Sequence, residues 1–222
     1  MHQQRKSAPR SKVWSSALKR PPKDGIPNGK LMKQFLDSPN LLQTIVSEAE
    51  KNSAAARLVA ADLTEAQLNW KPSPEQWSIA QCLEHLTVAT KGFEKYFSSA
   101  FEHARKNPQV GSAPRYKPSF VGGWLAKQVS PEAARKLPAP KIFRPGDSSA
   151  IQGPLESFLK AQDSFLDFVQ RSKGIDYNKT RLRSPVTPLM RYSLADAFVI
   201  TVLHGQRHLG QARRVREMAE FP

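Results

Sequence analysis

Cysteine and long apolar runs are both scarce in this chain of 222 residues. Its one cysteine, Cys82, excludes a disulfide within the chain and agrees with a reducing compartment, so we expect a cytoplasmic protein. No apolar run approaches the roughly 18 residues that a membrane-spanning helix needs. The first residues also lack the apolar core of a secretory signal. The composition therefore predicts a soluble protein.

Acidic residues are scarce in two segments, and these segments carry most of the net charge of +15. Residues 1–33 hold nine Lys and Arg against one acid, Asp24, and residues 107–146 hold seven against Glu132 alone. The remainder is nearly neutral. A nucleic-acid-binding domain more often concentrates its charge on one structured face. The pattern favours solvated basic segments and disfavours nucleic acid as a partner.

Apolar periodicity divides the chain into an arm and a helical domain. Residues 1–33 show no sustained period, so we expect a disordered basic arm there and one domain over 34–222. Within the domain, apolar residues recur at spacings of three and four, as on the buried face of a helix. The expected helices are 38–62, 79–106, 150–170 and 194–219. The fold class is all-α, a four-helix bundle, and no segment predicts a strand.

Helix-start signals support two of these boundaries. Ser78 with Gln81, and Ser193 with Asp196, have the spacing of a capping box, in which each side chain satisfies a backbone N–H of the other residue. These pairs place the beginnings of the second and fourth helices.

Prolines mark the connections. Pro72 and Pro74 exclude regular helix from the stretch 63–77. The segment 107–149 is also rich in proline, and we expect an irregular crossover with one short helix near 131–136. A connection of this length allows the second and third helices to run parallel.

Three of the five histidines lie on faces expected to point inward. His204 and His208 are four residues apart, so they share one helix face and could converge on one ion. Small residues beside them leave room for a buried site: Ala197, Thr201, Gly205 and Ala212. His85 lies two turns into the second helix, on its apolar face. We predict that the three histidines bind a metal; the alternatives are a solvated pair and a core histidine.

Three neutral imidazoles leave an open coordination position, which suits a catalytic site better than a structural one. Zinc and nickel are the first candidates, because manganese and iron usually take a carboxylate ligand. The residue after His204 is Gly205, so the His-Glu-x-x-His motif of metalloproteases is absent.

Other side chains near the histidines each allow two interpretations. Cys82 could be a fourth ligand or a small buried apolar residue. Gln211 could orient a ligand or be a surface amide. Trp77 could close the end of the bundle or line a small-molecule pocket. Glu84 points away from His85 and is expected to be a neighbour or a solvated side chain.

The motifs resemble the DinB/YfiT-like family. They are Trp77-Ser78, then Glu84-His85-Leu86, then His204-x-x-x-His208-x-Gly210-Gln211, and the similarity runs from about residue 36 to 219. The resemblance implies a four-helix bundle, often a homodimer, with His85, His204 and His208 as ligands of a divalent metal. It also implies chemistry on small molecules, since characterised relatives transfer low-molecular-weight thiols or isomerise maleylpyruvate.

Three functions follow from these features. The first is a metal-dependent enzyme that acts on a small molecule by thiol transfer or hydrolysis, because a metal can activate a bound thiol or water. The second is a bundle that binds metal without catalysis. The third is a binder of nucleic acid or an anionic surface through the basic arm and crossover.

Overall fold

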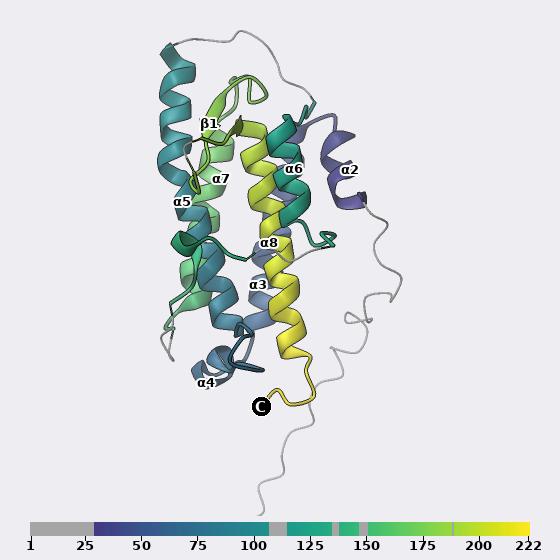
Figure 1. Ribbon diagram of the computed structural model, residues 1–222, viewed down its shortest axis with the longest axis vertical. Coiled ribbons are helices and arrows are strands. Elements are labelled where there is room, and N and C mark those ends of the chain that lie inside the picture. Colours follow the sequence, from purple (N-terminus) through teal and green to yellow (C-terminus); the bar gives the residue numbers. More distant parts are fainter. Residues whose placement is uncertain (1–28, 107–114, 135–137, 147–150, 188) are drawn as a thin grey trace, which may run out of the picture.

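The computed structural model describes residues 29–106, 115–134, 138–146, 151–187 and 189–222. Four long helices pack against one another in this part of the chain (Figure 1). They are α3 (Leu41–Ala60), α5 (Ile79–Lys106), α7 (Pro154–Arg171) and α8 (Leu194–Arg216). The expected all-α helical bundle is confirmed. Both predicted capping boxes are present, at Ser78 and at Ser193.

The long helices form two parallel pairs. Hydrogen bonds from Gln206 to Glu48 and from Arg216 to Leu58 keep a constant offset, so α3 and α8 run in the same direction. Figure 1 shows α5 and α7 running together the other way. Parallel α5 and α7 require the chain between them to return along the bundle, as the length of the crossover predicted.

The described part of the crossover contains more regular structure than the sequence suggested. It contains the helix α6 (Phe120–Val129) and the short 3-10 helix η1 (Lys141–Phe143). The short helix predicted near 131–136 is wrong where it can be compared, since residues 131–134 form turns; 135–137 lie outside the described residues. Helix α6 was not predicted because it contains Gly122 and Gly123, and glycine has a low helix propensity.

Four further short elements were not predicted. Helix α2 (Lys30–Leu36) occupies the end of the expected arm, whose residues 1–28 lie outside the described part. Helix α4 (Glu65–Asn69) lies in the connection before α5, ahead of its two prolines. The strands β1 (Arg181–Arg183) and β2 (Arg191–Ser193) pair antiparallel, so the expectation of no strand is wrong. Three-residue strands carry too little periodicity to detect.

The core consists of two apolar clusters stacked along the bundle. On α8 the first cluster ends at Leu203 and the second begins at Leu209. On α5 the second cluster ends at Leu86 and the first begins at Phe93. The three candidate histidines occupy this boundary between the clusters. In the first cluster Phe97 contacts aromatic rings of both α7 and α8, with centroids 5.2 Å from Phe168 and 5.3 Å from Phe198.

Helix α3 approaches α8 closely at Gly205. A Cβ atom there would lie 2.5 Å from the amide nitrogen of Asn52, which donates a hydrogen bond to the Val202 carbonyl at 3.0 Å. A side chain at position 205 would push the helices apart. The small residue beside the two α8 histidines therefore serves helix packing.

The buried carboxylate of Asp196 joins the crossover to the start of α8. Besides its own cap with Ser193, it accepts hydrogen bonds from the Tyr116 hydroxyl at 2.8 Å and the Ser119 hydroxyl at 2.7 Å. A Cβ atom at Gly122 would lie 2.2 Å from this carboxyl group. The glycine is what allows α6 to lie against the cap. Burial, with Asp196 beside it, raises the pKa of Tyr116, so this phenol stays a donor.

Replacing Asp196 with alanine should lower the free energy of unfolding by about 2–4 kcal/mol, because several buried donors lose a charged acceptor. Chemical denaturation of the parent and Asp196→Ala proteins measures this. The matched control is Asp167→Ala, which removes an exposed ion pair with Arg171 on α7 and should change stability by less than about 1 kcal/mol. Equal effects in the two variants would contradict the anchoring role.

Candidate metal centre

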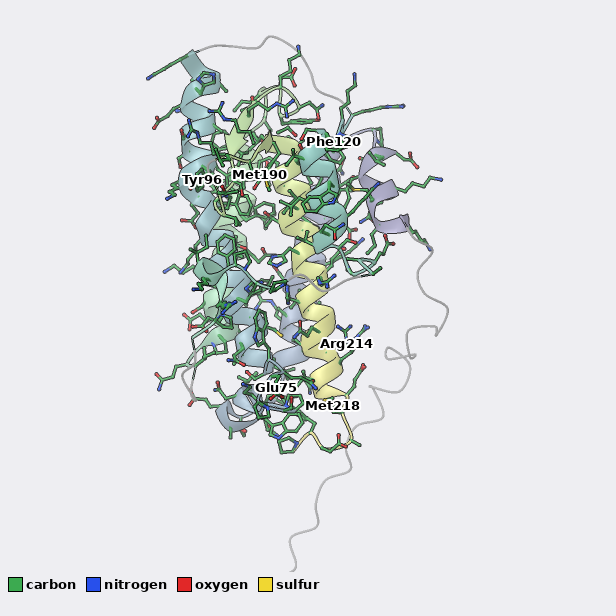
Figure 2. All side chains as sticks on the ribbon, in the orientation of Figure 1. Glu75, Tyr96, Phe120, Met190, Arg214 and Met218 are labelled. Carbon is green, nitrogen blue, oxygen red and sulfur yellow. The ribbon has the colours of Figure 1, made fainter. Side chains whose placement is uncertain are left out.

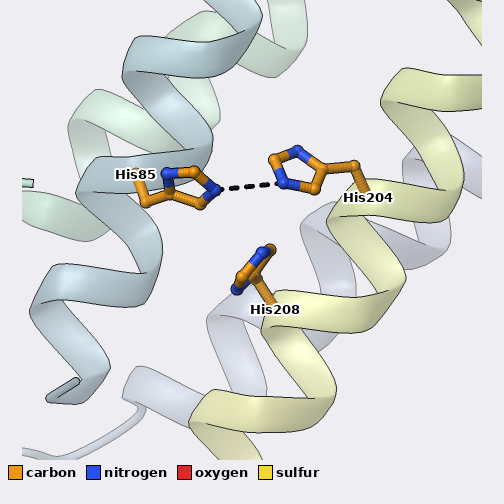
Figure 3. Close-up of side chains that lie close together, drawn as sticks. All are labelled: His85, His204 and His208. Carbon is orange, nitrogen blue, oxygen red and sulfur yellow. Dashed lines mark hydrogen bonds between the residues drawn. The ribbon is translucent and has the colours of Figure 1, made fainter. Parts of the chain in front are cut away.

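Helices α5 and α8 bring the three predicted histidines together. His85 projects from α5, and His204 and His208 project from successive turns of α8 (Figure 3). One ring nitrogen from each lies within 4.8 Å of the others. His85 is buried, and the other two are half-buried. In the part of the chain that the structure describes, this is the one group of ligand side chains of a size that could hold a metal ion.

Hydrogen bonds fix the tautomers of two of the rings. The Phe143 carbonyl oxygen lies 2.6 Å from His85 Nδ1, and the Gln211 side-chain oxygen lies 3.1 Å from His208 Nδ1. Both oxygens can only accept, so each Nδ1 carries the proton. The Nε2 atoms of His85 and His208 therefore carry lone pairs, and that of His85 accepts a hydrogen bond from His204 Nε2–H at 3.0 Å. A metal would replace that proton once His204 carries its own proton on Nδ1.

The third ring completes a donor set that fits a small cation. His204 Nε2 lies 3.0 Å from His85 Nε2, with the ring planes at 79°. Two imidazole ligands on a tetrahedral zinc ion stand roughly 3.4 Å apart, from bond lengths of about 2.0–2.1 Å. The separation of this pair differs from that value by a few tenths of an ångström, and the nitrogens of the whole set lie within 4.8 Å of one another. Side-chain rotation would draw the three nitrogens together around an ion.

Electrostatics keep the three imidazoles neutral, which is the form that binds metal. Burial lowers the pKa of His85, against the opposing effect of its bond to Phe143. Burial and then the neighbouring His208 lower the pKa of His204 well below its usual value. Burial, with smaller contributions from His85 and Arg207, lowers the pKa of His208 to about 3. Protons therefore compete poorly for these nitrogens at neutral pH.

Trp77 forms an aromatic wall on the site. Its ring stacks on His208 with centroids 5.6 Å apart and lies 4.8 Å from the ring of His85. The sequence allowed either end packing or a pocket wall, and the structure shows that Trp77 contacts the histidines. The Trp-Ser pair thus joins two functions, because Ser78 caps α5 while Trp77 holds two rings in place.

The crossover holds the other side of His85. The carboxylate of Glu84 accepts a hydrogen bond from the Gly146 N–H at 2.9 Å. Glu84 thereby holds against α5 the segment 141–146, which we call the strap. The Phe143 ring lies over Gly92, where an added Cβ atom would be 2.7 Å from the ring. Nothing in the sequence singled out Phe143. A backbone carbonyl acts here, and no residue pattern reveals which one.

Cys82 lies apart from the three ligand atoms. The group that could hold a metal contains histidines alone among the described residues, and Cys82 is packed in the second apolar cluster. Burial raises the pKa of its thiol to about 12. A thiol that stays protonated is a poor ligand, so the interpretation as a small buried apolar residue fits the structure better. For Gln211, by contrast, the bond to His208 matches the orienting role.

Comparison with known families decides the relationship of the chain. A sequence model of the DinB superfamily matches residues 48–212, which include all three histidines. The chain belongs to the DinB superfamily. The resemblance of the Trp-Ser and histidine motifs to this family is thereby confirmed. No curated protein and no solved structure matches the chain. Membership of this superfamily agrees with the helical fold. Among the described residues, none of the helices combines the length and the hydropathy that a membrane span requires.

In the metal-free protein, held so by a chelator, the free energy of unfolding should fall as the pH drops from 6.5 toward 3. In that window the unfolded His208 takes up a proton near 6.5, whereas the folded one does so only near 3. The unfolded state therefore binds more protons and gains stability, by up to about 1.4 kcal/mol per pH unit for each such group. Denaturation over this range should show a smaller slope for His208→Gln; an unchanged slope would contradict the assignment.

Gly92→Ala should weaken metal binding by about tenfold or more, because the added methyl group displaces Phe143 and its bond to His85. A zinc titration against a competing chelator measures the affinity. The control is Gly210→Ala on α8, where the new Cβ atom would meet only Arg214 at an ordinary 3.6 Å. Both changes favour helix equally. Equal affinities would show that the strap does not position His85.

Proposed function

We propose that His85, His204 and His208 bind one divalent transition metal, zinc or nickel, and that the protein is a metal-dependent enzyme acting on a small molecule. The observation that carries this is the convergence of three ring nitrogens, two of them with tautomers fixed by Phe143 and Gln211. Buried histidines in general find hydrogen-bond partners, but here both bonds fall on Nδ1 and leave the two Nε2 lone pairs for a ligand. The arrangement matches the way that metal-binding histidines are oriented in proteins.

The donor set supports a thiol or a water as the activated group. A divalent ion held there would supply Lewis acidity, which lowers the pKa of a bound thiol or water. Three neutral imidazoles provide no charge to offset such an ion, and the Arg207 guanidinium adds positive charge nearby. This environment favours an anionic fourth ligand. We therefore propose thiol transfer, with a low-molecular-weight thiol, or hydrolysis.

The residues of the chain have defined tasks in either reaction. His85 and His208 direct their Nε2 atoms into the site through the bonds to Phe143 and Gln211. Trp77 shields two of the rings from water on one side. As the family resemblance implies, we propose a homodimer, and the buried lone thiol of Cys82 agrees with a cytoplasmic setting.

Purified untagged protein should contain close to one equivalent of zinc or nickel, and the His85→Ala, His204→Ala and His208→Ala variants should each lose it. Elemental analysis by mass spectrometry, after incubation with either metal, measures the content. His103→Ala is the control, because His103 lies near the end of α5 and outside the cluster. A parent protein that binds neither metal would overturn the proposal.

Turnover separates an enzyme from a bundle that only binds metal. The loaded parent should conjugate glutathione to a chlorodinitrobenzene electrophile or hydrolyse a nitrophenyl ester, and His204→Ala should reduce that rate to background while circular dichroism shows a folded bundle. A metal that only stabilises the fold predicts a large drop in melting temperature on chelation and no metal-dependent rate.

A further inference from the structure

A second surface of the molecule lies away from the histidines, between α6 and the β1–β2 hairpin. A groove of about 530 Å³ opens there, lined mainly by apolar side chains of Phe120, Trp124, Leu189 and Met190, with Arg191 among them. Figure 2 labels Phe120 and Met190 near the end of the bundle where α8 begins. None of these residues takes part in the metal site or in the anchoring of α6 at Asp196.

The apolar side chains around this groove protrude into solvent. Phe120 is 94% exposed and Leu189 is 95% exposed, while Trp124 is 49% exposed. Isolated exposed apolar residues are ordinary, but three around one groove form a patch. Protruding aromatic and aliphatic tips on a folded surface are suited to burial in a partner or a lipid layer.

The two segments that build the patch carry positive charge and no acidic residue. These segments, residues 115–129 and 181–193, contain six Lys and Arg and no Asp or Glu. Arg183 and Arg191 are directly opposite each other across the two strands, and both are exposed. Like charges in such a cross-strand pair destabilise the hairpin. An external anion would relieve that repulsion.

We propose that this surface, made of Phe120, Trp124 and Leu189 with Arg183 and Arg191, docks on an anionic lipid bilayer. Apolar side chains that enter the interface, next to arginines that meet lipid headgroups, are the recognised means of peripheral membrane binding. A second copy of the chain is disfavoured, because a symmetric contact would bring two such basic patches together.

The proposal concerns a surface, and it stands or falls separately from the metal site. Residues 1–33 carry a charge of +8 and would also attract anionic vesicles. Every variant below retains that arm, so differences among them report the patch alone. Metal content serves as an independent check that the histidine site is intact.

The test is cosedimentation of the full chain with vesicles of equal parts phosphatidylcholine and phosphatidylglycerol, compared with pure phosphatidylcholine. The parent should bind the anionic vesicles. Phe120→Ser/Leu189→Ser should lower the partition coefficient by about tenfold, because two apolar tips no longer enter the bilayer. Arg183→Gln/Arg191→Gln should lower it by about fivefold per charge and weaken the salt dependence.

Two controls match these changes elsewhere on the surface. Leu58→Ser alters an apolar side chain that is 61% exposed on α3, and Lys91→Gln/Lys160→Gln removes two exposed charges from α5 and α7. The apolar control should bind as the parent does, and the charge control should lose less than the arginine pair. Circular dichroism verifies that each variant is folded.

Several results would overturn the proposal. One is a parent that does not bind the anionic vesicles; another is a patch variant that binds like the parent, which would assign all binding to the arm. A dimer that dissociates in Phe120→Ser/Leu189→Ser, with vesicle binding unchanged, would assign the surface to self-association. Loss of binding to single-stranded DNA in the same variant, again without a vesicle effect, would assign it to nucleic acid.

Discussion

The carboxylate of Asp196 is the interaction on which the arrangement of the crossover depends. It is fully buried, and it receives hydrogen bonds from the α8 cap and from the start of α6. From there the chain descends along α8, where Arg207 donates to the Ser130 carbonyl at 2.8 Å. Farther along the crossover, η1 lies against α5 (Figure 1), where the Phe143 carbonyl bonds to His85 and the Gly146 N–H bonds to Glu84.

This route explains why a long connection contributes to a site made by helices. The histidines lie where α5 packs against α8, and the crossover is hydrogen-bonded to both helices. The ion pairs found in the described residues join side chains three or four positions apart in sequence, so they brace single elements and do little to hold helices together. Apolar packing and a few buried polar contacts set the spacing between the helices. Gly205 and Asn52 do so on the α3 side.

The sequence predicted what depends on local spacing. The four-residue separation of His204 and His208 places both on one face, and the Ser193–Asp196 pair places the start of α8. The helical fold, the parallel course of α5 and α7 and the gathering of three histidines follow from such patterns. Helix α6 was missed because Gly122 is explained only by a contact with another element: it lies against Asp196 of α8. Contacts between distant segments have no period to read.

The partners of the histidines show the same limit more sharply. Gln211 was within reach of prediction because it lies one turn from His208 on the same helix. Phe143 was not, since its carbonyl reaches His85 across 58 positions of chain and through backbone atoms that every residue possesses. A glycine in an otherwise well-formed helix was the available signal. Gly92 lies within the continuous helix α5 at the position where the Phe143 ring fits. An unexplained helical glycine near a candidate ligand can therefore mark where another segment crosses.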